Sequence, residues 1–323
     1  MGSKVIGIEV GSDTLKMAVV KDNTVLKMAI ERMPQDLVVD GRVTSAEAMV
    51  RFLKDMMKKH GIRGGKCAMV LPPPTVVAQQ VSLPVMSETE LKLNLPFEFR
   101  DYVGKEMDKY EYDYIVQNLT ANRMELYAAA CRKDLVENYY NIFKKAGMTL
   151  KAAMPAEMAW LNVVTAAKEL PDEIAIVDIG YHSAHLNIFA KPDFIMGREI
   201  SVPNHLLRSD PLVSRTIDMD ETPEMQPPLT EDADELADVY GSIAVEVIKI
   251  LNFYNFSRPA EESRLQDIYY CGASSQLESL RVSIIKATDM TLHHAQRLLK
   301  MKNVNEDMAL YCSLAAGAAM QKL

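Results

Sequence analysis

The sequence predicts an α/β fold built from two related lobes. Residues 8–14 and 177–183 both read apolar, acid, apolar, glycine, any two residues and hydroxyl, and the two segments lie 169 residues apart. Each joins two apolar segments that are typical of strands. A pattern that returns once, at half the chain length, indicates two repeats whose turns face each other across a cleft.

Each repeat has the chemistry of a phosphate-binding turn. Gly11 and Gly180 let the backbone approach a ligand closely, and consecutive N–H groups in a turn form a concavity for anions. Carboxylates beside phosphates would repel them unless a divalent cation lay between, so we expect Glu9 and Asp178 to hold Mg²⁺. Lys16 would neutralise further phosphate charge. Taken alone, each motif could also be an ordinary hairpin with a small turn.

A third element follows later in the chain. Residues 268–271 form an apolar segment typical of a buried strand, residues 272–275 are small, and a helix is expected from residue 277. A strand that leads through small residues into a helix N-terminus leaves N–H groups free for a ligand.

Composition places the chain among ordinary globular proteins. Its 323 residues suit about two domains of ~150 residues each. With 36 basic and 44 acidic residues, the net charge is −8 and no dense basic stripe occurs, which disfavours nucleic-acid binding. Four dispersed cysteines form no C-x-x-C pair and favour a reducing cytoplasm. Neither a secretory signal nor an apolar run of ~18 residues is found.

Local patterns predict the elements of the first lobe and an insert. A third strand is expected over 25–31, a helix over 46–57 capped by Thr44, and a strand over 66–71. The three prolines at 72–74 mark a subdomain boundary.

The insert is expected to be α/β. It would hold strands at 75–83, 109–115 and 123–131, a helix opened by Ser87 that Pro96 kinks or splits, and a helix at 135–145. Alternating tyrosines on its second strand indicate a sheet face that is covered by a helix or borders a partner groove.

The second half repeats the strand order. A third strand is expected over 194–202, an acidic, proline-containing loop over 208–238, and helices over 236–256 and 307–320. Small residues at 315–319 in the last helix would allow close packing against a sheet.

The order hairpin, hairpin, strand–turn–helix resembles the actin and Hsp70 ATPase superfamily. Within it, residues 6–12, 83–86, 95–98 and 174–183 resemble the PilM family of type IV pilus assembly proteins, which is related to FtsA. The resemblance covers nearly the whole chain. It implies an actin-like (ribonuclease H-like) two-lobed fold with an FtsA/PilM-type inserted subdomain.

The resemblance also implies a domain division. Residues 1–74 and 149–172 would form the first lobe core, 75–148 the inserted subdomain, 173–201 and 265–323 the second lobe core, and 202–264 a second-lobe subdomain with the acidic loop.

It further implies ATP and Mg²⁺ between the lobes. Besides Glu9 and Asp178 at the metal, the residues carried over to the nucleotide are Gly11, Ser12, Asp13, Thr14 and Lys16 in the first phosphate motif, Gly180 and Ser183 in the second, Glu246 and Lys249 near the purine and ribose, and Gly272, Ala273 and Ser274 in the adenosine motif. No catalytic residue is assigned.

The function implied is that of a cytoplasmic scaffold. The family holds a cytoplasmic peptide of a membrane-anchored partner, PilN, on the insert side, and so couples the inner-membrane pilus platform to cytoplasmic components. Departures from the usual motifs, such as Glu9 where aspartate is usual, favour weak or no ATPase activity. An active ATPase or small-molecule kinase of the superfamily and an FtsA-like filament protein are the alternatives, and self-association stays open.

Overall fold

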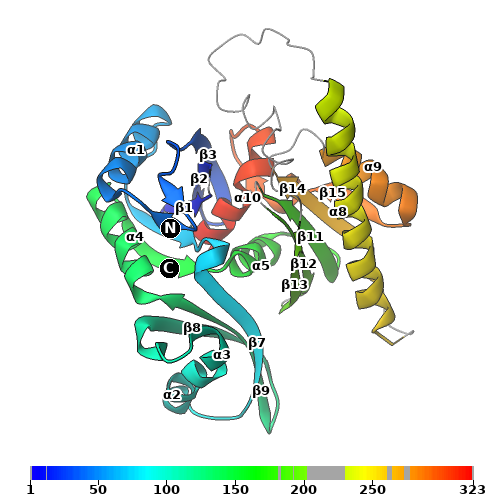
Figure 1. The fold of residues 1–323 in the computed structure, drawn as a ribbon, viewed down its shortest axis with the longest axis horizontal. Helices are drawn as coiled ribbons and strands as arrows, with labels where there is room; N and C mark the ends of the chain where they lie inside the picture. Colours follow the sequence, from blue (N-terminus) through cyan, green and yellow to red (C-terminus); the bar gives the residue numbers. More distant parts are fainter. Residues whose placement is uncertain are drawn as a thin grey trace.

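Two mixed β-sheets form the centres of two lobes (Figure 1). The computed structural model describes residues 2–11, 13–180, 183–191, 193–201, 230–259, 264–272 and 277–321. Residues 208–229 of the predicted acidic loop lie outside this part. Residues 230–238 begin helix α8 (Thr230–Phe256) instead of continuing a loop.

The first sheet has the strand order β10-β6-β1-β2-β3-β16. Its strands are β1 (Val5–Val10), β2 (Thr14–Lys21), β3 (Thr24–Arg32), β6 (Lys66–Val70), β10 (Thr149–Met154) and β16 (Lys300–Met301). β1, β2 and β3 form an antiparallel meander, whereas β6 runs parallel to β1. The buried residues of helices α1 (Ala46–Lys59) and α4 (Lys133–Lys145) join one core with this sheet. A short hairpin, β4 (Val38–Val39) and β5 (Arg42–Val43), lies before α1.

The second sheet repeats this arrangement in the order β13-β12-β11-β14-β15. Its strands are β11 (Glu173–Ile179), β12 (Ser183–Ala190), β13 (Asp193–Ser201), β14 (Asp267–Gly272) and β15 (Thr291–His294). Helices α8 and α9 (Leu277–Ala287) share a buried core with it. Since β11, β12 and β13 form the same meander, and β14 runs parallel to β11, the sequence repeat is a structural repeat.

Two helices join the lobes. Helix α5 (Ala156–Ala166) follows the first lobe in sequence but contacts β12 and β13 of the second. Helix α10 (Asp307–Ala319) follows the second lobe but packs on β1, β2 and β6 of the first. A Cβ on Gly7 would lie 1.7 Å from the carbonyl oxygen of Ala315, and one on Gly317 would lie 2.1 Å from that of Ala159. Small residues therefore allow the close packing that the sequence predicts.

The packing differs from the predicted domain division at three points. Helix α4, predicted for the insert, joins the core of the first sheet, and α8, predicted for the second-lobe subdomain, joins the core of the second sheet. Residues 265–323 were assigned to the second lobe, yet β16 pairs with β3 and α10 covers the first sheet. The local pattern predicts α10 as a helix but does not specify the sheet on which it packs, and it gives no signal for the two-residue strand β16.

The insert is a three-stranded sheet with two helices on one face. It consists of β7 (Val76–Pro84), α2 (Glu88–Glu98), α3 (Arg100–Val103), β8 (Tyr110–Leu119) and β9 (Arg123–Arg132), in the strand order β7-β9-β8. The three tyrosines Tyr110, Tyr112 and Tyr114 pack against the core beneath α2 and α3, so the covered-face alternative is confirmed. Pro96 lies inside α2, and the chain enters α3 four residues later.

The two expected helix caps have different outcomes. Ser87 forms the predicted capping box with Glu90. The expected cap at Thr44 is wrong by one residue, because Ser45 caps α1 and accepts from the N–H of Ala48. The hydroxyl of Thr44 instead donates to the carbonyl oxygen of Asp36 at 2.7 Å.

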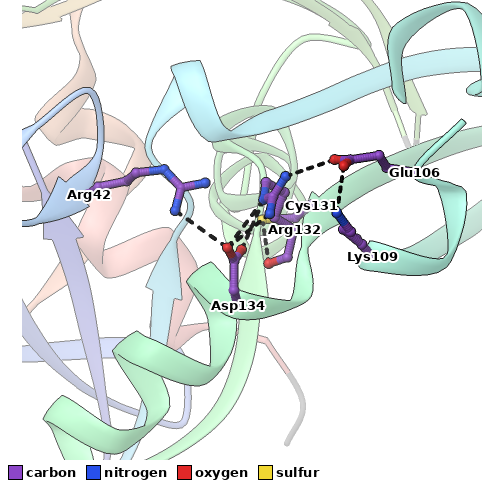
Figure 2. A network of polar contacts seen from close by, with 6 residues as sticks. All are labelled: Arg42, Glu106, Lys109, Cys131, Arg132 and Asp134. Carbon is purple, nitrogen blue, oxygen red and sulfur yellow. Dashed lines mark hydrogen bonds and ion pairs between the residues drawn. The ribbon is translucent and has the colours of Figure 1, made fainter. Parts of the chain in front are cut away.

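The insert contacts both lobes. At its base, Arg132 pairs with Asp134 and Glu106, while Arg42 of the first lobe reaches Asp134 at 3.7 Å (Figure 2). These pairs are exposed, so solvent screens them and they stabilise the protein little. On the other side, the amide groups of Gln80 and Gln117 donate to backbone carbonyls of β13.

Candidate functional site

The two repeated turns have the same geometry. The N–H of Gly11 donates to the carbonyl oxygen of Thr14 at 3.0 Å, and the N–H of Gly180 donates to that of Ser183 at 2.9 Å. Each turn closes the antiparallel pair that carries an acidic residue at the end of its first strand. The sequence-predicted glycines and hydroxyl residues therefore occupy equivalent places in the two lobes.

A small cavity lies where the two acidic strand ends meet. Glu9, Lys16, Asp178 and Gly272, four residues predicted for the site, line it together. Its free volume is about 10 Å³, the space of about one water molecule. Ligand pockets usually enclose about 300–1,000 Å³, so the cavity in this arrangement is too small for a nucleotide.

Gly272 closes the second-lobe side of the cavity. Its φ is +135°, and a Cβ there would lie 2.3 Å from the carbonyl oxygen of Ile179. Both facts favour glycine at this position. Ala273 and Ser274, which follow it in the predicted adenosine motif, lie outside the described residues.

Lys16 and Glu9 form an ion pair at the floor of the cavity. The Nζ of Lys16 lies 2.6 Å from Oε1 of Glu9, and both side chains are 16% exposed. Burial raises the pKa of the Glu9 carboxyl, and the ammonium of Lys16 opposes this effect. Burial lowers the pKa of Lys16, but the carboxylates of Glu9 and Asp178 outweigh it, so that this pKa is raised. Lys16 is therefore charged at neutral pH.

Similarity to known proteins identifies the family. A sequence model described as "Type IV pilus assembly protein PilM" matches residues 7–321. The chain belongs to the PilM family. A solved structure titled "PilM-PilN type IV pilus biogenesis complex" is 16% identical, with a TM-score of 0.78 over 99% of this chain and 98% of that chain.

The fold of this PilM-family chain is also that of a second solved structure. The ethanolamine utilization protein EutJ from Carboxydothermus hydrogenoformans is 12% identical, with a TM-score of 0.56 over 99% of this chain and 90% of that one. The expected actin-like α/β fold is thus confirmed. In the part of the chain described, no helix is long and apolar enough to cross a membrane.

A divalent cation fits the PilM-family site at Asp178 but not at Glu9. Mg²⁺ is usually held by one or two carboxylates together with substrate phosphates, and Asp178 lines the cavity. In contrast, one oxygen of Glu9 binds Lys16, and the other is buried without a hydrogen-bond partner. A hydrated cation could reach Glu9 only by displacing Lys16. Within the described ranges, no three His, Cys, Asp or Glu side chains converge as a metal site.

Three further predicted residues, Asp13, Glu246 and Lys249, do not line the cavity. Asp13 pairs with Arg32 at 3.3 Å, and Ser12 lies outside the described residues. On the outer side of α8, Glu246 and Lys249 pair with each other at 2.7 Å, and both are exposed. Neither of them lines the cavity.

The second turn carries a polar pair of its own. Oγ of Ser183 lies 2.9 Å from Nε2 of His185. Because His185 faces Asp178 across the hairpin, it occupies the place that Lys16 occupies in the first lobe. The predicted repeat therefore presents an ammonium on one side and an imidazole on the other.

Sequence reasoning missed the residues that the joining helices bring to the cavity. Trp160 comes from α5, whereas Leu310, Tyr311, Ser313 and Leu314 come from α10. Trp160 is buried and its indole N–H has no hydrogen-bond partner among the described residues. It is the single tryptophan of the chain, so its fluorescence reports on this cavity.

A thiol also lines the cavity. Burial raises the pKa of Cys271 well above its ordinary value. The group is therefore a neutral thiol at physiological pH, and it lacks the thiolate character that a nucleophile needs.

Proposed function

We propose that this PilM-family protein is a cytoplasmic nucleotide-binding scaffold of type IV pilus assembly. The observation that carries the proposal is the pair of equivalent turns whose strand ends meet at the cavity of Glu9, Lys16, Asp178 and Gly272. ATP would bind between the lobes, with the turns facing its phosphates and Asp178 near Mg²⁺. The scaffold role, with weak or no hydrolysis, is favoured by the departures from the usual motifs, such as Glu9 where aspartate is usual, and by the ion pair of Glu9 with Lys16.

Binding of ATP is tested at the second turn. We expect the protein to bind ATP with micromolar affinity, worth about −8 kcal/mol, as measured by calorimetry. Ser183→Asp places a carboxylate where the phosphates would lie, and charge repulsion should weaken binding by more than about tenfold. Thr149→Asp, at an exposed hydroxyl residue at the start of β10, is the control and should bind normally. Equal affinities of all three proteins would place the nucleotide elsewhere.

The insert offers a surface for the partner. One solved relative is a complex of PilM with PilN, and we infer that a cytoplasmic peptide of a membrane-anchored, PilN-like protein docks on the insert here. More than half of the large exposed apolar side chains in the described ranges belong to this subdomain. Strand β8 is an outer strand of its sheet and exposes Ile115, Val116 and Leu119. An extended apolar peptide adding to this strand gains backbone hydrogen bonds. The protein would thereby attach to the inner face of the membrane through its partner.

Partner docking is tested with a matched pair of valines. Val116 on β8 and Val245 on α8 are 49% and 50% exposed. We expect Val116→Lys to weaken binding of a labelled N-terminal PilN-like peptide by about tenfold or more, because the peptide's apolar side chains would meet a charge. Val245→Lys should have no effect on the fluorescence anisotropy titration. Loss of binding in the Val245 variant alone would move the docking site to the second lobe.

A further inference from the structure

The floor of the cavity already contains a positive charge, the ammonium group of Lys16. Glu9 and Lys16 are directly opposite each other on β1 and β2, so the hairpin itself brings the two charges together. The ammonium of Lys16 is 2.6 Å from one oxygen of Glu9 and also feels the charge of Asp178. The other oxygen of Glu9 has neither solvent contact nor a hydrogen-bond partner in the described part of the chain.

Lys16 keeps hydrogen-bonding capacity for a ligand. An ammonium group has three N–H donors, and among the described residues a single hydrogen bond, to Glu9, uses one of them. Lys16 lines the cavity, so two donors remain for a group that enters it. Phosphate oxygens are acceptors that form strong, charge-assisted hydrogen bonds with lysine.

We propose that Lys16 takes the place of a divalent cation at Glu9, so that the site binds the phosphates of a nucleoside triphosphate without requiring Mg²⁺. This inference rests on the proposed nucleotide-binding function and specifies how the site meets the phosphate charge. Glu9 is the counter-ion that holds the ammonium in place while no phosphate is bound. Because the Glu9 carboxylate neutralises the ammonium and repels phosphate, Glu9 lowers the affinity for the nucleotide.

The two roles of Glu9 predict opposite effects of one substitution. If Glu9 held a metal, Glu9→Gln would remove a ligand and weaken the binding of Mg²⁺–ATP. If Glu9 neutralises Lys16, the same substitution frees the ammonium and removes a repelling charge, so ATP binds more tightly. The sign of the change therefore decides between them.

The experiment is an ATP titration by calorimetry, once with Mg²⁺ and once with EDTA, with Trp160 fluorescence as the second readout. We expect the wild-type affinity to differ by less than about tenfold between the two conditions, and Glu9→Gln to bind about tenfold more tightly in EDTA. The double variant Glu9→Gln/Lys16→Met differs from the single one only at the ammonium and should lose binding in EDTA. Circular dichroism confirms that each variant is folded.

Two results would overturn the inference, and they are distinguishable. Loss of wild-type binding in EDTA, together with weaker Mg²⁺–ATP binding by Glu9→Gln, would make Glu9 a metal ligand and leave the nucleotide proposal intact. No binding by any variant in either condition would overturn the nucleotide proposal and this inference together.

Discussion

Replacing Gly7 with alanine is expected to destabilise the protein by at least about 3 kcal/mol, the upper end of the usual cost of overpacking a core. The added Cβ would lie 1.7 Å from the carbonyl oxygen of Ala315 and 2.8 Å from its carbonyl carbon. Both are backbone atoms of α10, which cannot move aside as the end of a flexible side chain can. The helix would have to shift away from β1. Urea denaturation followed by Trp160 fluorescence measures the loss.

A second glycine provides the matched control for Gly7. Gly241 lies within α8, and a Cβ added there would meet no atom within 4 Å. Gly241→Ala should therefore stabilise the protein by up to about 1 kcal/mol, because alanine is the better helix former. Equal effects of the two substitutions would contradict the close packing of α10 against β1.

Replacing Lys16 with methionine is expected to destabilise the protein by about 3–5 kcal/mol, because it leaves the Glu9 carboxylate buried without its partner. Methionine keeps much of the length of the side chain and removes the charge. The same denaturation experiment measures the effect on the free energy of unfolding.

The double variant Glu9→Gln/Lys16→Met tests the cause of that loss. It buries no unpaired charge, so most of the lost stability should return. A single Lys16→Met variant within about 1 kcal/mol of the wild type would show that the ion pair contributes little to the folded state.

The repeat explains why so much of the fold could be predicted from the sequence. Strand–turn–strand patterns around Gly11 and Gly180 are local, and their recurrence indicated two lobes with the same meander. Local hydrogen bonding also specifies the cap at Ser87 and the end of α1 near Gly61, whose φ is +58°. The short strands β15 and β16 were missed, since two to four residues carry too little periodicity.

The candidate site was only partly predictable, for two different reasons. Lys16 was expected to meet phosphate, yet the hairpin that pairs Gly11 with Thr14 also sets Lys16 opposite Glu9. This pairing follows from counting outward from the turn, so the sequence contained the signal. Trp160 had no such signal, because α5 reaches the cavity only through its packing between the lobes.

Helix α10, which follows the second lobe in sequence but packs on the first sheet, also affects the order in which the chain can complete its structure during synthesis. Strands β1, β2 and β3 are made before the insert and the second sheet, whereas α10, the helix that covers one of their faces, is made after both. Until then, the apolar residues of that face, such as Ala18 and Val20, have no cover from α10. The first lobe is therefore completed only after the second sheet has been made, and a nascent chain exposes that face to chaperones until α10 is synthesised.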